Sequence, residues 1–383
     1  MAGLDQSPCR VHSEVTDRGA TATRSGQARH YSRLVKLGLS MGYVVGAGVH
    51  DHVALAQEAD RLGYSVAWAA EAYGSDSPTV LSYVAATTRH IDVGAAVMQI
   101  PARTPAMTAM TAATLDLLSG GRFRLGLGVS GPQVSEGWHG VRFDKPLART
   151  REYVEVVTMA MRREPVRHEG EFFTLPLPDG PGKALRLTVH PARDRIPVYL
   201  AAVGPKNLEL AGEIADGWLA VFFSPEHAAQ SLASVHAGRS AARRLAEPFD
   251  VAATVPVSIG SDVASCADSI RAYAALYIGG MGSRRQNFYN QLASRMGFQA
   301  EAERVQDLYL DKRHREAQAA VPVDFIDQTS LLGPPDRITD RLRAFADAGV
   351  TTLSVATFAP DLEIRIATLR RVSEALEAAG LAD

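Results

Sequence analysis

Residues 121–131 read GRFRLGLGVSG, a short apolar run that ends in small residues. The part over 122–129 predicts a buried strand. From Gly126 to Gly131 the glycines also have the G-x-G-x-x-G spacing of a dinucleotide-binding loop. Such a loop needs a helix directly after its third glycine, because the pyrophosphate binds at that helix's N-terminus. The residues after Gly131 therefore decide the fold.

Residues 132–146 read PQVSEGWHGVRFDKP and show no apolar helical period. We expect a loop here, with no helix before about Lys145, and hence no nicotinamide-binding fold. The strand then ends in turns at Ser130 and Gly131, where small residues permit close approach of a flat or anionic ligand. Alternatively, these glycines serve only packing and a tight turn.

Short apolar runs alternate with segments of helical period over the rest of the chain. Several helical segments end in a glycine just before the next run, as Gly63 and Gly349 do. Eight such units predict an α/β fold, a single (β/α)8 TIM barrel, rather than a doubly wound sheet. The expected strands are 37–44, 65–70, 92–98, 122–129, 197–203, 217–223, 251–259 and 351–357.

Two regions interrupt the alternation and are predicted as insertions. A hairpin is expected near 165–195, where two strand-like runs flank a Pro/Gly-rich turn, and a helical insertion near 279–330. The barrel domain is assigned to 36–383. Residues 1–35 are polar, lack the apolar segment of a secretory signal, and are predicted to be a disordered extension.

Composition excludes several classes of protein. The formal net charge of -2 over 383 residues gives no electrostatic footprint for nucleic acid. No apolar run approaches the ~20 residues that span a bilayer. The two cysteines, Cys9 and Cys266, lie far apart without a CxxC pattern, so neither a disulfide framework nor a metal site is expected. We expect a protein of the reducing cytoplasm.

A second glycine segment follows the fifth expected strand. Gly204, Pro205 and Lys206 lead directly into the helical run NLELAGEIA. Proline suits the first helical turn, whose free N–H groups and positive dipole end attract anions, and Lys206 adds a full charge. The alternative is ordinary helix initiation with a lysine that faces solvent.

The third expected strand runs into a proline-rich loop, in the sequence GAAVMQIPARTPA over 94–106. Small residues inside a strand suggest a bulge or contact with a planar group. Arg103 lies just before the next helix, where it supports either an anion or a neighbouring carboxylate.

Three segments together carry a resemblance to a known family: GAAVMQIPARTPA, LSGGRFRLGLGVSGPQVSEGWHG and PVYLAAVGPKNLELAGEIADGW. They resemble the bacterial-luciferase-like superfamily, and within it the branch that uses coenzyme F420, which includes methylenetetrahydromethanopterin reductase. The likeness covers roughly residues 36–375.

The resemblance implies a deazaflavin at the carboxyl end of the barrel. Its ring would lie against a bulge in the third strand with a cis peptide at Ala96-Val97. Its phosphate-bearing tail would be held by Ser130 and Gly131 on one side and by Gly204, Pro205 and Lys206 on the other. Sugar-phosphate dehydrogenases of the family have an acidic residue after the fourth-strand glycine. This chain has Pro132 and Gln133 there, which argues against a sugar phosphate.

The resemblance also implies an oxidoreductase that transfers a hydride between the deazaflavin C5 and a small organic substrate, and a homodimer. Glu71, at the end of the second strand, is the candidate acid/base; alternatively it pairs with an arginine or a loop amide. Two other functions stay open, a monooxygenase that uses reduced FMN and a non-catalytic cofactor-binding barrel. The predicted pocket walls are Tyr43, Gln99, Trp138 and His139.

Overall fold

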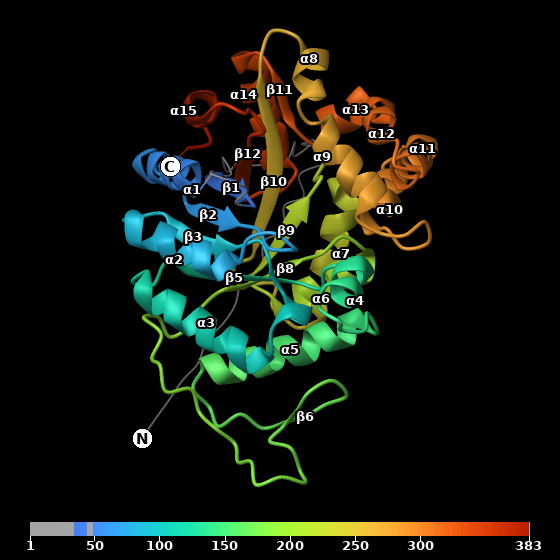
Figure 1. Ribbon diagram of the computed structural model, residues 1–383. Coiled ribbons are helices and arrows are strands. Elements are labelled where there is room, and N and C mark those ends of the chain that lie inside the picture. The colour runs from blue at the N-terminus through green and yellow to red at the C-terminus, as the bar shows by residue number, and fades with distance from the viewer. Residues whose placement is uncertain (1–33, 44–48, 383) are drawn as a thin grey trace, which may run out of the picture. The chain divides into compact units, whose positions relative to one another are not determined.

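Eight parallel strands close into a barrel in the computed structural model, which describes residues 34–43 and 49–382. All eight predicted strands are confirmed, and every neighbouring pair is parallel (Figure 1). In ring order they are β1 (Lys36–Gly42), β2 (Val66–Ala69), β3 (Asp92–Ala95), β5 (Phe123–Gly128), β8 (Val198–Ala201), β9 (Gly217–Val221), β10 (Asp250–Ile259) and β12 (Thr352–Ala356).

A layer of helices surrounds the strands (Figure 1). Side chains alternate along each strand, so Leu37 and Leu39 of β1 point outward into the core shared with the helices. Several helices begin at a side-chain cap; Asp76, for example, accepts from the N–H of Thr79 at the start of α2. The helices that follow barrel strands are α1 (Val49–Arg61), α2 (Ser77–Thr87), α3 (Pro105–Leu118), α5 (Pro146–Met161), α6 (Pro205–Ile214), α7 (Ala228–Ala241), α14 (Pro335–Asp347) and α15 (Leu362–Ala378).

The predicted N-terminal extension lies almost entirely outside the described residues. Its last residue does not belong to it: Val35 is buried in the core, and its N–H donates to the carbonyl of Leu381 at 3.0 Å. The ordered barrel therefore begins slightly earlier than predicted.

The helical insertion is confirmed, but it begins at Val263, earlier than the predicted 279, and it groups on one side of the barrel (Figure 1). A short strand, β11 (Leu331–Gly333), follows it and pairs in parallel with the last three residues of β10, outside the ring of eight strands. The insertion contains α8 (Val263–Asp268), α9 (Arg271–Ala275), the π-helix η2 (Leu276–Gly280), α10 (Phe288–Arg295), α11 (Gln299–Leu310), α12 (His314–Ala320) and α13 (Val323–Gln328).

The predicted hairpin is shorter than expected. It consists of β6 (His168–Glu169) and β7 (Thr174–Leu175), which pair across residues 170–173 and not across the Pro/Gly-rich turn. The second predicted run, near 184–189, forms no strand. It is held by a few bonds to the chain before β6, such as that from the Val166 N–H to the Leu185 carbonyl.

The segment after Gly131 was wrongly predicted. A six-residue helix, α4 (Pro132–Gly137), starts directly there with Gly131 at its N-cap. It has no apolar period because only Val134 and Ser135 are buried on one turn, so periodicity could not reveal it. The absence of a helix was therefore a wrong reason for rejecting a dinucleotide fold. The closed barrel is what excludes that fold.

Large and small residues share the middle of the barrel. The Trp68 ring lies over Gly94, where a Cβ atom would come within 2.3 Å of it. At Gly126 a Cβ atom would come within 1.9 Å of the Ala95 carbonyl oxygen. Only glycine fits at these two positions, because a neighbouring atom lies where a Cβ atom would be. Gly126 is one of the glycines in the stretch with dinucleotide-loop spacing.

Candidate active site

The carboxyl ends of the barrel strands surround a recess lined by small residues. Since side chains alternate, the inward positions can be followed from Trp68 and Leu219, which pack inside the barrel. Apart from Gln99, which pairs with inward-facing Gly128, the inward residues at this end are no larger than valine, and most are partly exposed although strands surround them. They are Ser40, Ala70, Ala96, Val97, Gly128, Ala201, Val221, Thr254 and Ala356.

The third strand is bulged at this recess, as predicted. Four residue steps separate Gly94 from Met98, but only three separate their partners Arg124 and Leu127 on β5. After the bulge the chain resumes pairing as β4 (Met98–Gln99) and turns through a short 3-10 helix, η1 (Ile100–Ala102). The peptide bond between Ala96 and Val97 is cis, as the family resemblance implied.

Gln99 and Ser130 connect the bulge to the loop after β5. Gln99 is 1 % exposed; its amide donates to the Ala72 carbonyl at 2.6 Å and accepts from the Ser130 hydroxyl at 2.9 Å. Ser130 has a φ of 62°, an uncommon conformation for a residue with a side chain. Gln99 thus holds this loop in place, a role different from the pocket wall predicted for it.

Helix α6 begins on the rim next to that loop, because β5 and β8 are neighbours. Its N-cap is Gly204, without a side-chain hydrogen bond, so the first-turn N–H groups are open to an anion. Lys206 does not add the predicted charge there. Its side chain is 78 % exposed and its ammonium pairs with Glu209 at 2.7 Å, which matches the alternative of a solvent-facing lysine.

Glu71 lies at the end of β2 and is held on both oxygens. One pairs with the guanidinium of Arg103, and the other accepts from the Ser77 hydroxyl at 2.9 Å. Arg103 also pairs with Asp76, the N-cap of α2. The alternative for Glu71, pairing with an arginine, is what the structure contains, and Arg103 supports carboxylates rather than an anionic ligand. The acid/base role of Glu71 stays a prediction.

A cluster of aromatic side chains from the insertion faces the rim, and sequence reasoning missed it. Phe222, directly after β9, contacts Tyr273, Tyr277 and Tyr289 with ring centroids 5.4, 5.6 and 6.2 Å away. Phe222 has a φ of 54°, which is rare for a bulky residue and marks a site that its surroundings enforce. Tyr277 sits on the π-helix, a feature frequent at functional sites.

The tyrosine hydroxyls of this cluster are protonated over the physiological range. Burial raises the pKa of Tyr277, Tyr273 and Tyr43 above the ordinary value, and raises that of Tyr289 to about 12. With their protons in place, these hydroxyls can donate a hydrogen bond to a ligand as well as accept one.

The other three predicted pocket walls, Tyr43, Trp138 and His139, differ in burial and contacts. Tyr43 is half-buried and packs against Gly74, where a Cβ atom would lie 3.4 Å from its ring. It directly follows β1, so it lies at the rim of the carboxyl end. Trp138 is 67 % exposed at the end of α4 and encloses no pocket. His139 is half-buried, and its Nε2 has no hydrogen-bond partner.

The recess fits a flat ring with an anionic extension. Small side chains leave the space for a ring, and the open N–H groups of α6 beside the Ser130 loop suit a phosphate. Within residues 34–43 and 49–382 there is no group of three or more His, Cys, Asp or Glu side chains that could hold a metal ion. None of the helices described there has the length and apolar character needed to cross a membrane.

The chain folds into a (β/α)8 barrel. Its carboxyl end carries the bulged third strand, the start of α6 and the helical insertion. This is the end at which (β/α)8 barrel enzymes have their active sites. The chain belongs to the bacterial luciferase-like family, whose model, described as luciferase-like monooxygenase, matches residues 21–352.

Three relatives illustrate where the chain falls in the family. It is 42 % identical over 328 residues to a Mycobacterium tuberculosis protein provisionally named a coenzyme F420-dependent oxidoreductase, covering 84 % of this chain and 94 % of the relative. It is 28 % identical to 5,10-methylenetetrahydromethanopterin reductase of Archaeoglobus fulgidus, covering 76 % and 85 %. The solved structure of the coenzyme F420 dependent tetrahydromethanopterin reductase from Methanopyrus kandleri superposes with a TM-score of 0.75 at 25 % identity, covering 88 % and 97 %.

Proposed function

We propose that this protein is a coenzyme F420-dependent oxidoreductase that transfers a hydride to or from a small organic substrate. The observation that carries the proposal is the recess of small residues at the carboxyl end of the barrel, bounded by the bulge and by the start of α6. The similarity to F420-dependent relatives supports the choice of cofactor. Its proposed compartment is the cytoplasm, as expected from the sequence.

The residues around the recess fit this cofactor. The bulge at Ala96 and Val97 would contact the ring, and a side chain larger than Ala201 on β8 would occupy its space. The first-turn N–H groups of α6, with Gly204 and Pro205, and the loop at Ser130 and Gly131 would bind the phosphate. When bound, coenzyme F420 supplies a carbon that donates or accepts a hydride.

The aromatic cluster would form the substrate side of the site. Phe222, Tyr43 and Tyr277 present apolar faces, which favours a weakly polar substrate over a sugar phosphate. The hydroxyl of Tyr277 is protonated and has a proton to donate, so it would bond a substrate oxygen. Glu71, held by Arg103 and Ser77, would position the loop after β2, and its predicted acid/base role is the alternative that a rate measurement can test.

The second candidate function is a monooxygenase that uses reduced FMN, which the family's description favours. The two differ in their need for oxygen. We expect the protein to oxidise reduced F420 under strictly anaerobic conditions with at least one ketone, enone or imine from a panel. Oxygen uptake with reduced FMN, without anaerobic turnover of F420, would instead support the monooxygenase.

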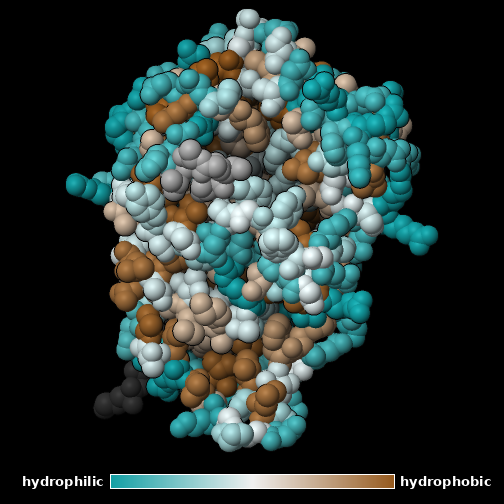
Figure 2. Space-filling model, viewed as in Figure 1, coloured by the Kyte–Doolittle hydropathy of each residue, from teal (hydrophilic) through white to brown (hydrophobic). Residues whose placement is uncertain are grey.

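We also propose a homodimer that buries the exposed face of α3. Apolar side chains gather over this helix (Figure 2). Met107, Met110, Leu117 and Leu118 are 50, 49, 54 and 65 % exposed. The one ionisable residue of α3, Asp116, is fully buried against Arg193, so no charge opposes contact with a second copy.

Sedimentation velocity tests the dimer. The protein is expected to sediment as a dimer at micromolar concentration, and Met110→Glu with Leu118→Glu to sediment as a monomer, since each would bury a charge. Leu310→Glu, at another exposed leucine, is the matched control. A monomeric wild-type protein would refute the proposal.

A further inference from the structure

The π-helix η2, which carries Tyr277, is a single turn that ends at Gly280. Carbonyl groups near the end of a helix have no following turn whose N–H groups they could accept from, so other donors must satisfy them. The carbonyls of Tyr277 and Ile278 lie in this last stretch. Both accept a hydrogen bond from one side chain, that of Asn287.

Asn287 joins the segments that carry two tyrosines of the aromatic cluster. It is 3 % exposed, and its Nδ2 donates to the Tyr277 carbonyl at 3.1 Å and to the Ile278 carbonyl at 2.8 Å. Its Oδ1 accepts from the N–H groups of Tyr289 and Asn290, both at 3.0 Å, as the N-cap of α10. Both donors and the acceptor oxygen of the amide are therefore used, and they tie η2 to the start of α10.

The chain between η2 and Asn287 is closed tightly upon itself. A Cβ atom at Gly282 would come within 2.3 Å of the Gln286 carbonyl oxygen and within 2.7 Å of the Asn287 Cα. Ser283 and Gln286 exchange backbone hydrogen bonds of 3.2 and 3.1 Å. The loop thus returns Asn287 to the end of η2 by its own backbone geometry, so the reach of the amide is set before any ligand binds.

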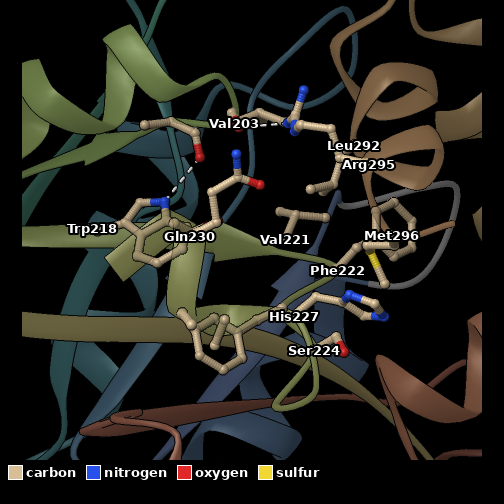
Figure 3. A pocket seen from close by; sticks show the side chains of 15 residues that line it. Val203, Trp218, Val221, Phe222, Ser224, His227, Gln230, Leu292, Arg295 and Met296 are labelled. Carbon is tan, nitrogen blue, oxygen red and sulfur yellow. Dashed lines mark hydrogen bonds between the residues drawn. The ribbon is translucent and has the colours of Figure 1, made fainter. Parts of the chain in front are cut away.

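Helix α10 is itself fixed to the barrel. In Figure 3 its side chains Leu292 and Met296 lie beside Val221 and Phe222, at the end of β9. Met296 and Phe222 belong to one buried apolar cluster. Through Asn287, the backbone of η2 is therefore held in a defined position relative to the strand end that carries Phe222.

Ring contacts alone would not fix the Tyr277 hydroxyl. The Tyr277 ring meets Tyr289 and Phe222 edge to face, with centroids 4.8 and 5.6 Å away. Such contacts contribute only about 0.5–1.5 kcal/mol each. Proton transfer requires the donor within hydrogen-bond reach of the substrate, and a displacement of about 1 Å can cost a hundredfold in rate. The backbone of η2 must therefore hold the ring at the right depth.

We propose that Asn287 is a positioning residue for the reaction, whose amide holds the backbone of Tyr277 so that its hydroxyl stays within reach of a substrate oxygen. Asn287 acts through Tyr277 and not on the substrate itself. The inference rests on the proposed function, in which Tyr277 has a proton to donate.

Fluorine NMR of the full-length protein, with 3-fluorotyrosine in place of tyrosine, tests the structural step without cofactor or substrate. Tyr277→Phe and Tyr289→Phe assign the two signals. Asn287→Ser removes the amide donors and keeps an oxygen that can cap α10, so it should shift or broaden both signals. Asn287→Asp, which keeps the size of the side chain and the cap oxygen, should do the same and serves if the serine variant does not fold.

The matched control is Asp262→Ala, which removes the N-cap of α8 in the same insertion. It should leave both signals in place, and the signal of Tyr64, buried in the main core, should not respond to any of these variants. Unchanged Tyr277 and Tyr289 signals in a folded Asn287 variant overturn the proposal.

Anaerobic turnover of reduced F420 with the panel of ketones, enones and imines tests the functional step. Asn287→Ser should lower kcat by about tenfold and keep KM within about threefold. In a Tyr277→Phe background it should lower kcat no further, because both changes act on one hydroxyl.

The remaining outcomes separate this inference from the proposed function. An unchanged kcat in Asn287→Ser, or a loss that adds in full to that of Tyr277→Phe, overturns this inference alone. If the wild-type protein turns over no F420, or if Tyr277→Phe keeps full kcat, the proposed function fails at that point and the positioning role fails with it.

Discussion

The two ends of the barrel are built from the same eight strands but are filled in opposite ways. At the amino end, inward-facing Arg124 pairs with Asp92 and Asp250, and Tyr199 donates to Asp250 at 2.9 Å. A hollow of about 610 Å³ adjoins these groups, yet its charged side chains are largely paired with one another. At the carboxyl end the inward residues are small and the helix N–H groups are open. One end uses its polar groups for stability, and the other leaves them for a ligand.

Replacing Arg124 would remove the ion pairs at the amino end of the barrel, and we expect it to have the largest effect on stability. Arg124→Met leaves Asp92 and Asp250 without their cation, and removing one partner of a buried pair costs about 3–5 kcal/mol. Chemical denaturation would measure the loss. Arg195→Met, at an arginine whose partner Asp216 also binds Arg244, is the control and should cost less than about 1 kcal/mol.

That variant also tests whether the two ends are independent. The folded fraction of Arg124→Met should bind cofactor with unchanged affinity. A weaker affinity at conditions where the protein is folded would show that the amino end shapes the site.

A large side chain in the recess is expected to abolish cofactor binding at the carboxyl end while the protein still folds. Ala201→Phe places a ring where we propose the cofactor binds, and we expect cofactor affinity to fall by at least about a hundredfold, roughly 2.7 kcal/mol. Fluorescence titration measures it, and a melting curve serves as the folding control. Unchanged affinity in a folded variant would place the ring elsewhere.

The roles of Tyr277 and Glu71 can be separated by rates. Tyr277→Phe removes the proposed proton donor and keeps the ring, so kcat should fall by about tenfold to a hundredfold with little change in KM. Tyr289→Phe, in the same cluster, should change kcat less than about threefold.

Glu71→Gln provides the contrasting measurement. If Glu71 only positions Arg103 and the loop after β2, this variant should lose about 1–2 kcal/mol of stability and keep kcat within about threefold. A fall of kcat by a hundredfold, with the pH profile flattened, would return the acid/base role to Glu71.

The smallest expected effect on stability comes from Glu58, which belongs to neither end of the barrel. Hydrogen bonds from Arg61 and Arg370 lower the pKa of Glu58, on α1, to about 2. A lowered pKa stabilises the fold above the ordinary value near 4.5, and this contribution is lost as pH falls from about 4.5 towards 2. Glu58→Gln should therefore remove less than about 1 kcal/mol at pH 7 and flatten stability below pH 4.5. Equal slopes in both proteins would contradict the assignment.

The sequence predicted the barrel because eight apolar runs alternate with helical periods, and that signal is local. It also located the bulge and both rim loops, through the small residues that each requires. Short α4 escaped detection because one helical turn has no measurable period. The tyrosine cluster escaped because it lies more than fifty residues beyond β9 and meets the rim only in three dimensions. The spacing of Tyr273 and Tyr277, one helical turn apart, was the available signal for the cluster.

The sequence was least able to predict which charged side chains pair with each other. Lys206 had the right position in the chain but pairs with Glu209 three residues on, as helical geometry allows. Glu71 and Arg103 were both singled out, yet only the structure shows that they bind each other.

The central claim is that the recess at the carboxyl end holds a deazaflavin, and titration of the purified protein with F420 and with FMN tests it most directly. We predict saturable binding of F420 at micromolar concentration or below, with no comparable binding of FMN. Saturable binding of FMN alone would contradict the claim.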